Sequence, residues 1–152
     1  MFNMATYIRN KKAKFDYEIK DTLEAGVVLF GHEVKAIRNG KGKLEGAHVI
    51  IRGNEAFLVN SHVSPYQEKN TSPDYDPNRP RKLLLSQKEL TKLEEDSEHA
   101  GLTIVPISWY NKNGKIKLEI AVARGKKKTD KRETIKERDS KRAIDRLLKS
   151  QR

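Results

Sequence analysis

Side chains that could do chemistry are scattered along this chain and form no recognisable catalytic motif. The four histidines have no HExxH or other metal-ligand spacing, and no cysteine is present to complete a metal site. No serine lies in a Gly-x-Ser-x-Gly turn, and no Walker-type or GxGxxG loop occurs. Asp74 and Asp76 could suggest a metal-dependent nuclease, but carboxylates in a proline-rich stretch are more often turn formers. We therefore expect no enzymatic activity, no cofactor and no bound metal.

A glycine-rich basic segment, Gly40-Lys41-Gly42-Lys43, has two interpretations that the sequence alone does not separate. Its backbone N–H groups could hold a phosphate, as glycine-rich loops do in nucleotide-binding proteins. Equally, Gly40 could end a helix and begin an ordinary turn. Both interpretations stay open at the level of sequence.

Positive charge is the feature that points to a partner. The chain has 152 residues with 32 Lys and Arg against 21 Asp and Glu, a net charge of +11. Residues 124–152 hold 13 of the basic and 5 of the acidic residues, so the preceding part is nearly balanced. A balanced domain followed by a basic arm is typical of a protein that binds a polyanion. A tail that merely increases solubility is the alternative.

Length and hydropathy exclude several classes of protein. A chain of this length forms one domain with one core. Its longest apolar runs, such as residues 25–30, fall far short of the ~18 to 20 residues that cross a bilayer, so we expect no membrane partner. No apolar region follows the basic N-terminal residues, so no secretory signal is expected. The lack of cysteine fits a cytoplasmic location.

Three features favour RNA as the polyanion. The basic run from Arg124 to Lys128 leaves a predicted strand directly, which would fix a phosphate-binding clamp to a rigid domain. Aromatic and basic residues alternate between Tyr7 and Tyr17, as stacking on unpaired bases requires, although Phe15 is better explained as core. Lys35 and Arg38 lie three residues apart on a predicted helix with Glu24 shortly before it, so cations and an acceptor for a base edge could converge.

The elements that must position these residues follow from periodicity and turn signals. Alternating and buried-type residues predict a strand over residues 15–29 with a bend at Gly26, and a short helix over 31–40. Gly53-Asn54 predicts a hairpin of residues 47–52 and 55–60. Four prolines make residues 64–81 a long surface loop.

The second half of the chain has the clearer signals. Ser86 stands three residues before Glu89, a capping-box pattern that predicts a helix ending at Gly101. Asn113-Gly114 predicts a second hairpin of residues 102–110 and 115–123, in which apolar residues alternate with polar or small ones.

These elements predict a fold that is mainly β with short helices, an OB-fold-like antiparallel β-barrel plus a basic C-terminal tail. We place the barrel domain at residues 1–128 and the tail at 129–152. The few apolar residues of the tail form no continuous stripe, and short helices are marginal in water. The tail from about Lys128 onward is therefore expected to be disordered alone and helical when bound.

Several segments resemble, in order and spacing, those of the SsrA-binding protein family (small protein B, SmpB). The resemblance covers about residues 8–149. It rests on the segments 10–13 (NKKA), 17–19 (YEI), 24–26 (EAG), 31–35 (GHEVK), 38–41 (RNGK), 81–85 (RKLLL) and 123–132 (ARGKKKTDKR).

The resemblance implies a non-enzymatic RNA-binding adaptor of trans-translation. Such a protein binds the tRNA-like domain of transfer-messenger RNA (tmRNA, SsrA RNA) and delivers it, with elongation factor Tu, to ribosomes stalled on mRNA without a stop codon. Its tail would sense the empty mRNA channel near the decoding centre, so that the ribosome is rescued and the nascent peptide is tagged for degradation. A cytoplasmic monomer is implied.

The resemblance also implies roles for individual residues. Positions matching the family's RNA-contact surface, with their basic neighbours, are Asn10, Lys11, Tyr17, Glu24, Lys35, Arg38, Lys41, Leu84 and Arg124, although Leu84 could instead be core. Positions matching the ribosome-engaging tail are Gly125, Lys126, Lys127, Lys128, Asp130, Lys131 and Arg132. Thr129 stands where family members often carry a stacking His or aromatic residue, so Lys126 to Lys128 would have to compensate by charge.

Two other functions remain to be distinguished. A structural ribosomal protein with a basic extension would share the charge pattern but not the set of motifs. An OB-fold nuclease would need catalytic carboxylates beside an arginine.

Overall fold

The computed structural model describes residues 5–126, 132, 135–136, 138–144 and 146. Its elements, in chain order, are β1 (Thr6–Arg9), α1 (Ala13–Asp16), β2 (Tyr17–Val27), α2 (Gly31–Arg38), β3 (Gly42–Lys43), β4 (His48–Arg52), β5 (Glu55–Val59), β6 (His62–Val63), the 3₁₀ turn η1 (Glu68–Asn70), β7 (Arg81–Leu84), α3 (Gln87–Glu98), β8 (Leu102–Lys112) and β9 (Lys115–Gly125).

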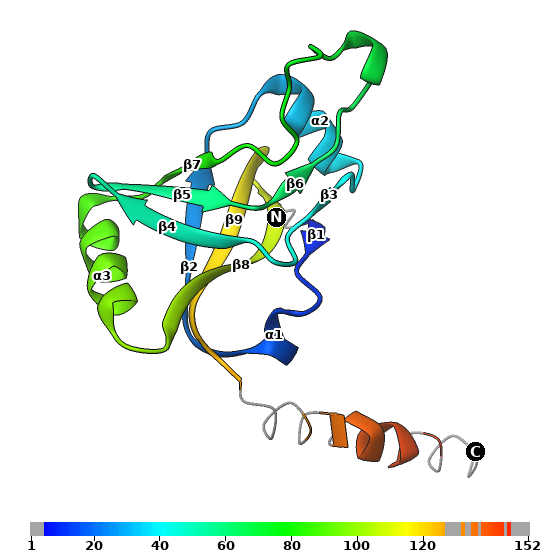
Figure 1. Cartoon of the computed structure of the whole chain (residues 1–152). Coiled ribbons are helices and arrows are strands. Elements are labelled where there is room, and N and C mark those ends of the chain that lie inside the picture. Colours follow the sequence, from blue (N-terminus) through cyan, green and yellow to red (C-terminus); the bar gives the residue numbers. More distant parts are fainter. Residues whose placement is uncertain (1–4, 127–131, 133–134, 137, 145, 147–152) are drawn as a thin grey trace.

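Seven strands form one antiparallel sheet that curls around a core (Figure 1). Their order is β1-β8-β4-β5-β7-β2-β9, and β9 also pairs with β8. At the junction of β4 and β8 the only residues paired are Val49 and Ile104, so the barrel is not closed there. The prediction of a mainly β, antiparallel chain with short helices is confirmed, whereas the predicted barrel is not closed. β3 and β6 form a separate two-stranded sheet.

The two predicted hairpins are both present. Asn113 and Gly114 have φ angles of 52° and 79° and connect β8 to β9. Gly53 and Asn54, with φ of 56° and 65°, connect β4 to β5. Two successive residues at positive φ form the tight turn whose twist matches that of antiparallel strands, and Asn-Gly adopts it readily. Long β9 then pairs on its other edge with β2 from Tyr17 to Gly26.

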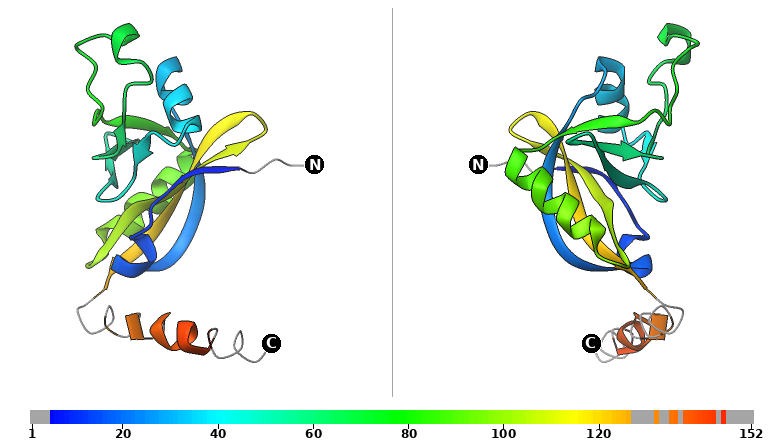
Figure 2. Two further views of the ribbon diagram at one scale, coloured as in Figure 1. Left: turned by 90° about the vertical axis from the view of Figure 1, so that its right-hand side faces the viewer. Right: turned by 60° about the vertical axis from the view of Figure 1, so that its left-hand side comes forward.

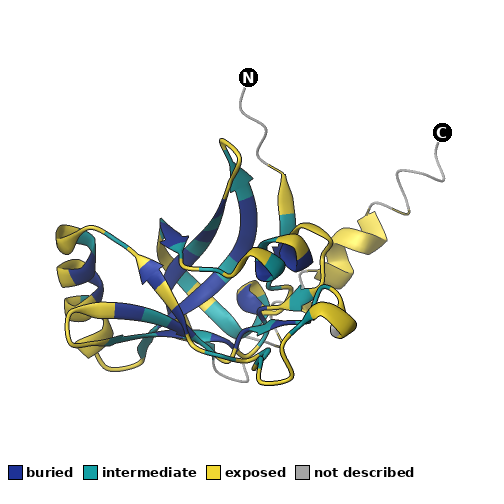
Figure 3. Ribbon diagram, turned by 90° about the horizontal axis from the view of Figure 1, so that it is seen from above, coloured by how far each residue is buried: buried dark blue, intermediate teal, exposed yellow. Residues whose placement is uncertain are grey.

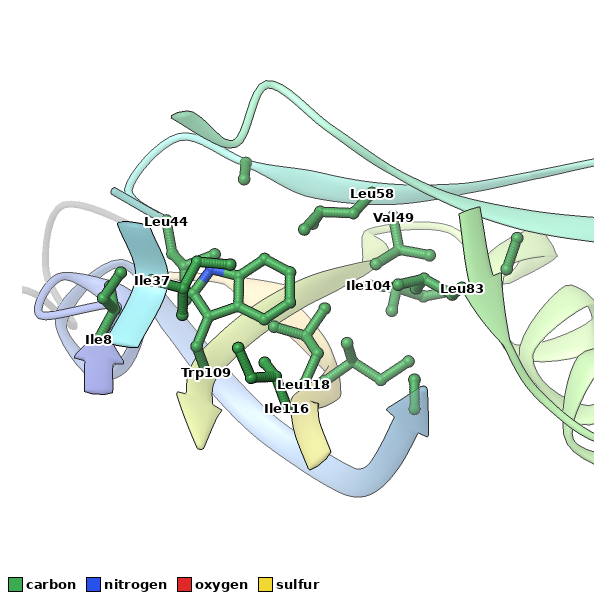
Figure 4. Packing of buried hydrophobic residues seen from close by; sticks show 14 of the residues in the cluster. Ile8, Ile37, Leu44, Val49, Leu58, Leu83, Ile104, Trp109, Ile116 and Leu118 are labelled. Carbon is green, nitrogen blue, oxygen red and sulfur yellow. The ribbon is translucent and has the colours of Figure 1, made fainter. Parts of the chain in front are cut away.

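The core lies between the curled sheet and the elements that cover its ends (Figures 3 and 4). Trp109 of β8 is fully buried at its centre, next to Leu118 and Ile116 of β9. Leu90 and Leu93 of α3 join the same cluster, as does Ile37 of α2. The alternation predicted for β9 is therefore confirmed, because its inward residues are buried while Lys117 between them faces outward.

Helix α3 begins at the predicted cap but ends at Glu98, before the Gly101 predicted from the sequence. The Ser86 hydroxyl accepts a hydrogen bond from the backbone N–H of Glu89, and the Glu89 carboxylate accepts one in return from the N–H of Ser86. Helix α2 ends at Arg38, and Gly40 follows at a φ of 73°. Among the residues described, no helix is both long and apolar enough to span a membrane.

The prediction of a strand beginning at Phe15 is wrong. Phe15 and Asp16 belong to the one-turn helix α1, in which the N–H of Asp16 donates to the carbonyl of Lys12 at 2.8 Å. The carbonyl of Asp16 accepts from the N–H of Lys126, which is the last link of the β2–β9 pairing on this side. Strands β1, β3, β6 and β7 were not predicted, because two to four residues give too short a pattern.

The described residues of the tail, 132, 135–136, 138–144 and 146, are helical and lie beyond α1 (Figure 2). The Arg138 guanidinium lies over the half-buried Phe15 ring at 5.3 Å from its centre. The boundary between a barrel domain of residues 1–128 and a tail of 129–152 remains a prediction, as does the tail's order in the free protein.

Candidate nucleic-acid interface

The outer face of β7, β2 and β9 carries the first group of predicted residues. Gly26 of β2 lies opposite both Leu84 of β7 and Lys117 of β9. A Cβ atom at Gly26 would lie 3.1 Å from the Leu84 Cβ and 3.6 Å from the Lys117 Nζ, so the glycine brings the two side chains together. Leu84 is 53% exposed, which excludes the core interpretation. An exposed leucine beside a lysine is suited to the ribose and phosphate of RNA.

Glu24 lies on the same strand, two residues before Gly26. Its carboxylate accepts a hydrogen bond of 2.5 Å from the Tyr110 hydroxyl and is 3.2 Å from the Lys112 Nζ. The Tyr110 hydrogen bond, followed by that of Lys112, lowers the pKa of Glu24 although partial burial opposes this. Burial, together with Glu24, raises the pKa of Tyr110. The ionised carboxylate keeps lone pairs for further donors, such as the amino groups of a base edge.

Arg38 and Glu24 meet the same hairpin at different points. The Arg38 guanidinium donates to the carbonyl of Gly114 at 3.1 Å and so ties helix α2 to the β8–β9 turn. Sequence reasoning expected the two charges to converge. The structure instead links each of them to a separate residue of that hairpin.

The segment 40–43 forms the turn after α2 and then strand β3, in which Gly42 and Lys43 pair with β6. The N–H groups of Gly40 and Lys41 donate to the carbonyls of Ile37 and Ala36, the last carbonyls of α2. These donors are therefore already used, which removes the backbone phosphate cradle that the sequence left open. The side chains of Lys41 and Lys43 remain exposed.

Lys35 and Lys41 share an aromatic partner that sequence reasoning did not select as a site residue. The Nζ atoms lie 5.9 and 5.6 Å from the centre of the Tyr66 ring. Tyr66 belongs to the proline-rich loop and is half-buried against the main core. The loop thus brings an aromatic ring to two predicted RNA-binding lysines.

Asn10 supports the chain where it leaves β1. Its side-chain amide donates to the carbonyl of Pro106 at 2.9 Å, at an irregular point of β8. Its half-buried position indicates a structural contribution beside any contact with RNA. Lys11 next to it is exposed on the rim of a surface hollow.

The root of the tail lies at the other end of the same strand pair. Tyr17 pairs with Gly125 and packs, half-buried, on the small cluster around Val105. Arg124 and Gly125 are exposed, and Arg132 is helical and exposed. Lys127, Lys128, Asp130 and Lys131 lie outside the described residues, as does Thr129. Glu24 follows Tyr17 by seven steps along the strand, roughly 23 Å if the strand is fully extended.

A buried ionic cluster that sequence reasoning missed holds the proline-rich loop against the barrel. Glu33 of α2 and Arg81 of β7 are both fully buried and form an ion pair at 2.7 Å. Arg79 also pairs with Glu33, and the Tyr75 hydroxyl donates to Glu33 and to the carbonyl of Val63. Burial alone would raise the pKa of Glu33, but the hydrogen bonds from Arg79, the Phe30 backbone and Arg81 lower it to about 2.

No set of metal ligands is assembled within the part of the chain that the structure describes. No three or more His, Asp or Glu side chains there are grouped so that they could hold a metal ion. The Asp76 carboxylate accepts a hydrogen bond from the N–H of Asn78 at 2.9 Å, as a turn former does.

Comparisons with known proteins show which family the chain belongs to. The family model described as SmpB protein matches residues 7–150. The SsrA-binding protein of Trichodesmium erythraeum is 51% identical over 140 residues, covering 92% of this chain and 90% of the relative. The SsrA-binding protein of Paraburkholderia xenovorans is 47% identical over 143 residues, covering 94% of this chain and 97% of the relative.

A solved structure described as "tmRNA-SmpB: a journey to the center of the bacterial ribosome" contains a similar chain. The TM-score is 0.68 at 41% identity, with 82% of this chain and 87% of that chain covered. With the family model matched over nearly the whole sequence, this chain belongs to the SmpB family of SsrA-binding proteins.

Proposed function

We propose that this protein is the RNA-binding adaptor of trans-translation. It binds the tRNA-like domain of tmRNA, delivers it to ribosomes stalled on mRNA without a stop codon, and enables rescue of the ribosome and tagging of the nascent peptide. Membership of the SmpB family, whose members are similar to this chain along almost its entire length, carries this proposal.

The division of labour between barrel and tail forms part of the proposal. The outer face with Glu24, Leu84 and Lys117 binds the folded RNA, while the basic segment after Arg124 enters the ribosome's empty mRNA channel. The long pairing of β2 with β9 supports this division, because it holds the two regions at opposite ends of one strand pair.

The finer parts of the assignment extend the proposal to partners and location. The protein acts in the cytoplasm as a monomer, without catalytic activity of its own. Aminoacylated tmRNA and elongation factor Tu accompany it to the ribosome. Gel filtration of the protein with and without the factor and charged tmRNA tests the monomer and the complex, and a dimer in the free state would contradict the monomer.

The binding face is tested by replacing Glu24 with Ala and measuring affinity for the isolated tRNA-like domain. We expect a larger loss than for Glu98→Lys on α3, because Glu24 lies on the proposed face and Glu98 lies on the exposed surface of another element. Equal losses would show that the wrong face has been assigned.

The tail is tested by ending the chain after Lys128. Binding of the tRNA-like domain should stay near the wild-type value because the barrel is intact. Peptide tagging on ribosomes stalled without a stop codon should be abolished. A shortened chain that still supports tagging would overturn the role of the tail.

Two alternatives predict different results. A structural ribosomal protein would bind generic duplex RNA as well as the tRNA-like domain. A nuclease would shorten RNA in the presence of magnesium.

A further inference from the structure

The contact of two lysines with the Tyr66 ring has a geometry that the proposed function does not explain. Lys35 comes from helix α2 and Lys41 from the turn after it, yet both ammonium groups lie within 6 Å of the centre of one ring. Aromatic faces attract cations, and this attraction offsets part of the repulsion between two like charges. The ring therefore has two positive charges beside it.

These charges are not neutralised by the rest of the described chain. Among the described residues, neither ammonium group forms an ion pair with a carboxylate, although six other ion pairs are present. Both side chains are exposed. A pair of exposed cations held in place without a counter-charge is a site for an anion from solution.

The backbone around Tyr66 is held firmly. The N–H of Ser64 donates to the carbonyl of Lys41 at 3.1 Å, which ties the loop to the turn after α2. The Tyr75 hydroxyl donates to the carbonyl of Val63 at 2.9 Å, and Tyr75 is itself held by the buried Glu33. The two cations are thus placed by the fold before any ligand arrives, which lowers the entropy cost of binding.

Each lysine lines a surface hollow. Lys35 and Tyr66 line one of about 410 Å³ between the start of α2 and the loop, together with Gly31, His32 and Asn70. Lys41 lines another, of about 650 Å³, whose charged residues are Lys41, Lys43 and Glu45. The smaller hollow, with its aromatic wall and polar rim, has the size of a small-ligand pocket.

We propose that Lys35, Lys41 and Tyr66 form a phosphate site for single-stranded RNA backbone, with the adjoining nucleoside in the hollow beside His32. The site is separate from the face that carries Glu24 and Leu84. Unpaired nucleotides are what proteins commonly recognise in RNA, because their bases are free to enter such hollows. This inference rests on the proposed function only in taking the RNA to be the tRNA-like domain of tmRNA.

The phosphate contact is tested by the salt dependence of binding between the full-length protein and the isolated tRNA-like domain. Lys35→Gln and Lys41→Gln should each make the slope of log K against log salt less steep by roughly 0.7, the value per phosphate of a single strand. Lys88→Gln, an exposed lysine of α3, is the matched control and should leave the slope unchanged.

The ring and the hollow are tested separately. Tyr66→Leu should weaken binding roughly five- to a hundredfold with an unchanged slope, whereas Tyr66→Phe should bind like the wild type. A side chain at Gly31 would project into open space, so Gly31→Trp narrows the hollow and Gly31→Ala controls for the backbone. We expect Gly31→Trp to weaken binding at least fivefold and Gly31→Ala to leave it unchanged.

The results separate the two proposals. If the wild-type protein does not prefer the tRNA-like domain over bulk tRNA, the proposed function fails. If it does, but the Lys35 and Lys41 variants keep the slope of the Lys88 control, the phosphate site is wrong. If Gly31→Trp binds the RNA as tightly as the wild type, the nucleoside does not occupy the hollow and that part of the proposal is wrong. Tyr66 is half-buried, so Tyr66→Leu could also disturb packing. Lys35 and Lys41 are exposed, so the lysine variants test the phosphate site even if the Tyr66 variant folds poorly.

Discussion

Removing the charge of Glu33 should destabilise the protein more than removing any exposed carboxylate. Glu33 is fully buried and balances two guanidinium groups, those of Arg79 and the equally buried Arg81. In Glu33→Gln both cations keep a hydrogen-bond acceptor but lose the neutralising charge. A buried cation without its partner is costly because it has also lost its water.

The pKa of Glu33 sets the size of this effect. Its shift from 4.5 to about 2 corresponds to about 3 kcal/mol of stabilisation, the lower end of the roughly 3 to 5 kcal/mol expected on removing one partner of a buried pair. The folded-state pKa lies below the unfolded one, so this contribution is complete above about pH 4.5. It is lost as the pH falls toward 2.

Urea unfolding measures the difference in stability between Glu33→Gln and the wild type. It can be followed by the fluorescence of Trp109, which is the only tryptophan in the sequence and is fully buried. We expect Glu33→Gln to lower the free energy of unfolding by about 3 kcal/mol at pH 7 and by much less near pH 2. Glu55→Gln is the control, because its 3.5 Å pair with Lys82 is exposed and worth less than about 1 kcal/mol. The reasoning is refuted if the two variants lose the same free energy of unfolding at pH 7. It is also refuted if the stability difference between Glu33→Gln and the wild type is as large near pH 2 as at pH 7.

Three further substitutions test particular contacts. Gly42→Ala should lower the free energy of unfolding in urea by about 1 to 3 kcal/mol, because the new Cβ would lie 2.9 Å from the backbone oxygen of His62; wild-type stability would contradict this packing. Ser86→Ala should cost about 1 kcal/mol in the same assay through loss of the helix cap, and a neutral result would mean the cap is dispensable. Tyr110→Phe removes the hydrogen bond that lowers the pKa of Glu24, so a carboxyl NMR titration should show that pKa rising, and an unchanged pKa would rule out this cause.

The sequence predicts local structure well where one residue type is required by the backbone. Asn113 and Gly114 adopt the positive φ angles that their types allow, and the strands on either side follow their alternating pattern. The cap at Ser86 is equally local, since the hydroxyl and its partner are three residues apart. In each case the decisive interaction lies within a few residues of chain.

Phe15 shows where local reasoning fails. Its alternation with Tyr17 and Ile19 is that of a strand, and Tyr17 and Ile19 do lie in β2. Phe15 itself lies in α1, where its N–H donates to the carbonyl of Lys12, and the pairing with distant β9 reaches back only to the hydrogen bond from Lys126 to the carbonyl of Asp16. No pattern around residue 15 contains that information.

The candidate site was predictable in part. Lys117 could have been found from the alternation of β9, since its neighbours Ile116 and Leu118 face the core. Leu84 could not be placed, because three consecutive leucines have no polar contrast to show which of them faces outward. The role of Glu33 depends on arginines more than 40 residues away in sequence, and its burial contradicts the usual preference of glutamate for the surface.

The distribution of charge fits the different tasks proposed for the two regions. The part before residue 124 carries a net charge of +3, too little to attract RNA strongly without specific contacts, whereas residues 124–152 carry +8. Recognition by the barrel must therefore depend on the positions of its cations and hydrogen-bond acceptors. Neighbouring side chains hold these groups in place: Tyr110 contacts Glu24, and Tyr66 contacts Lys35 and Lys41. The tail supplies attraction that depends on charge more than on exact placement. A partner with the shape of a tRNA and a channel lined with phosphates would make these two demands separately.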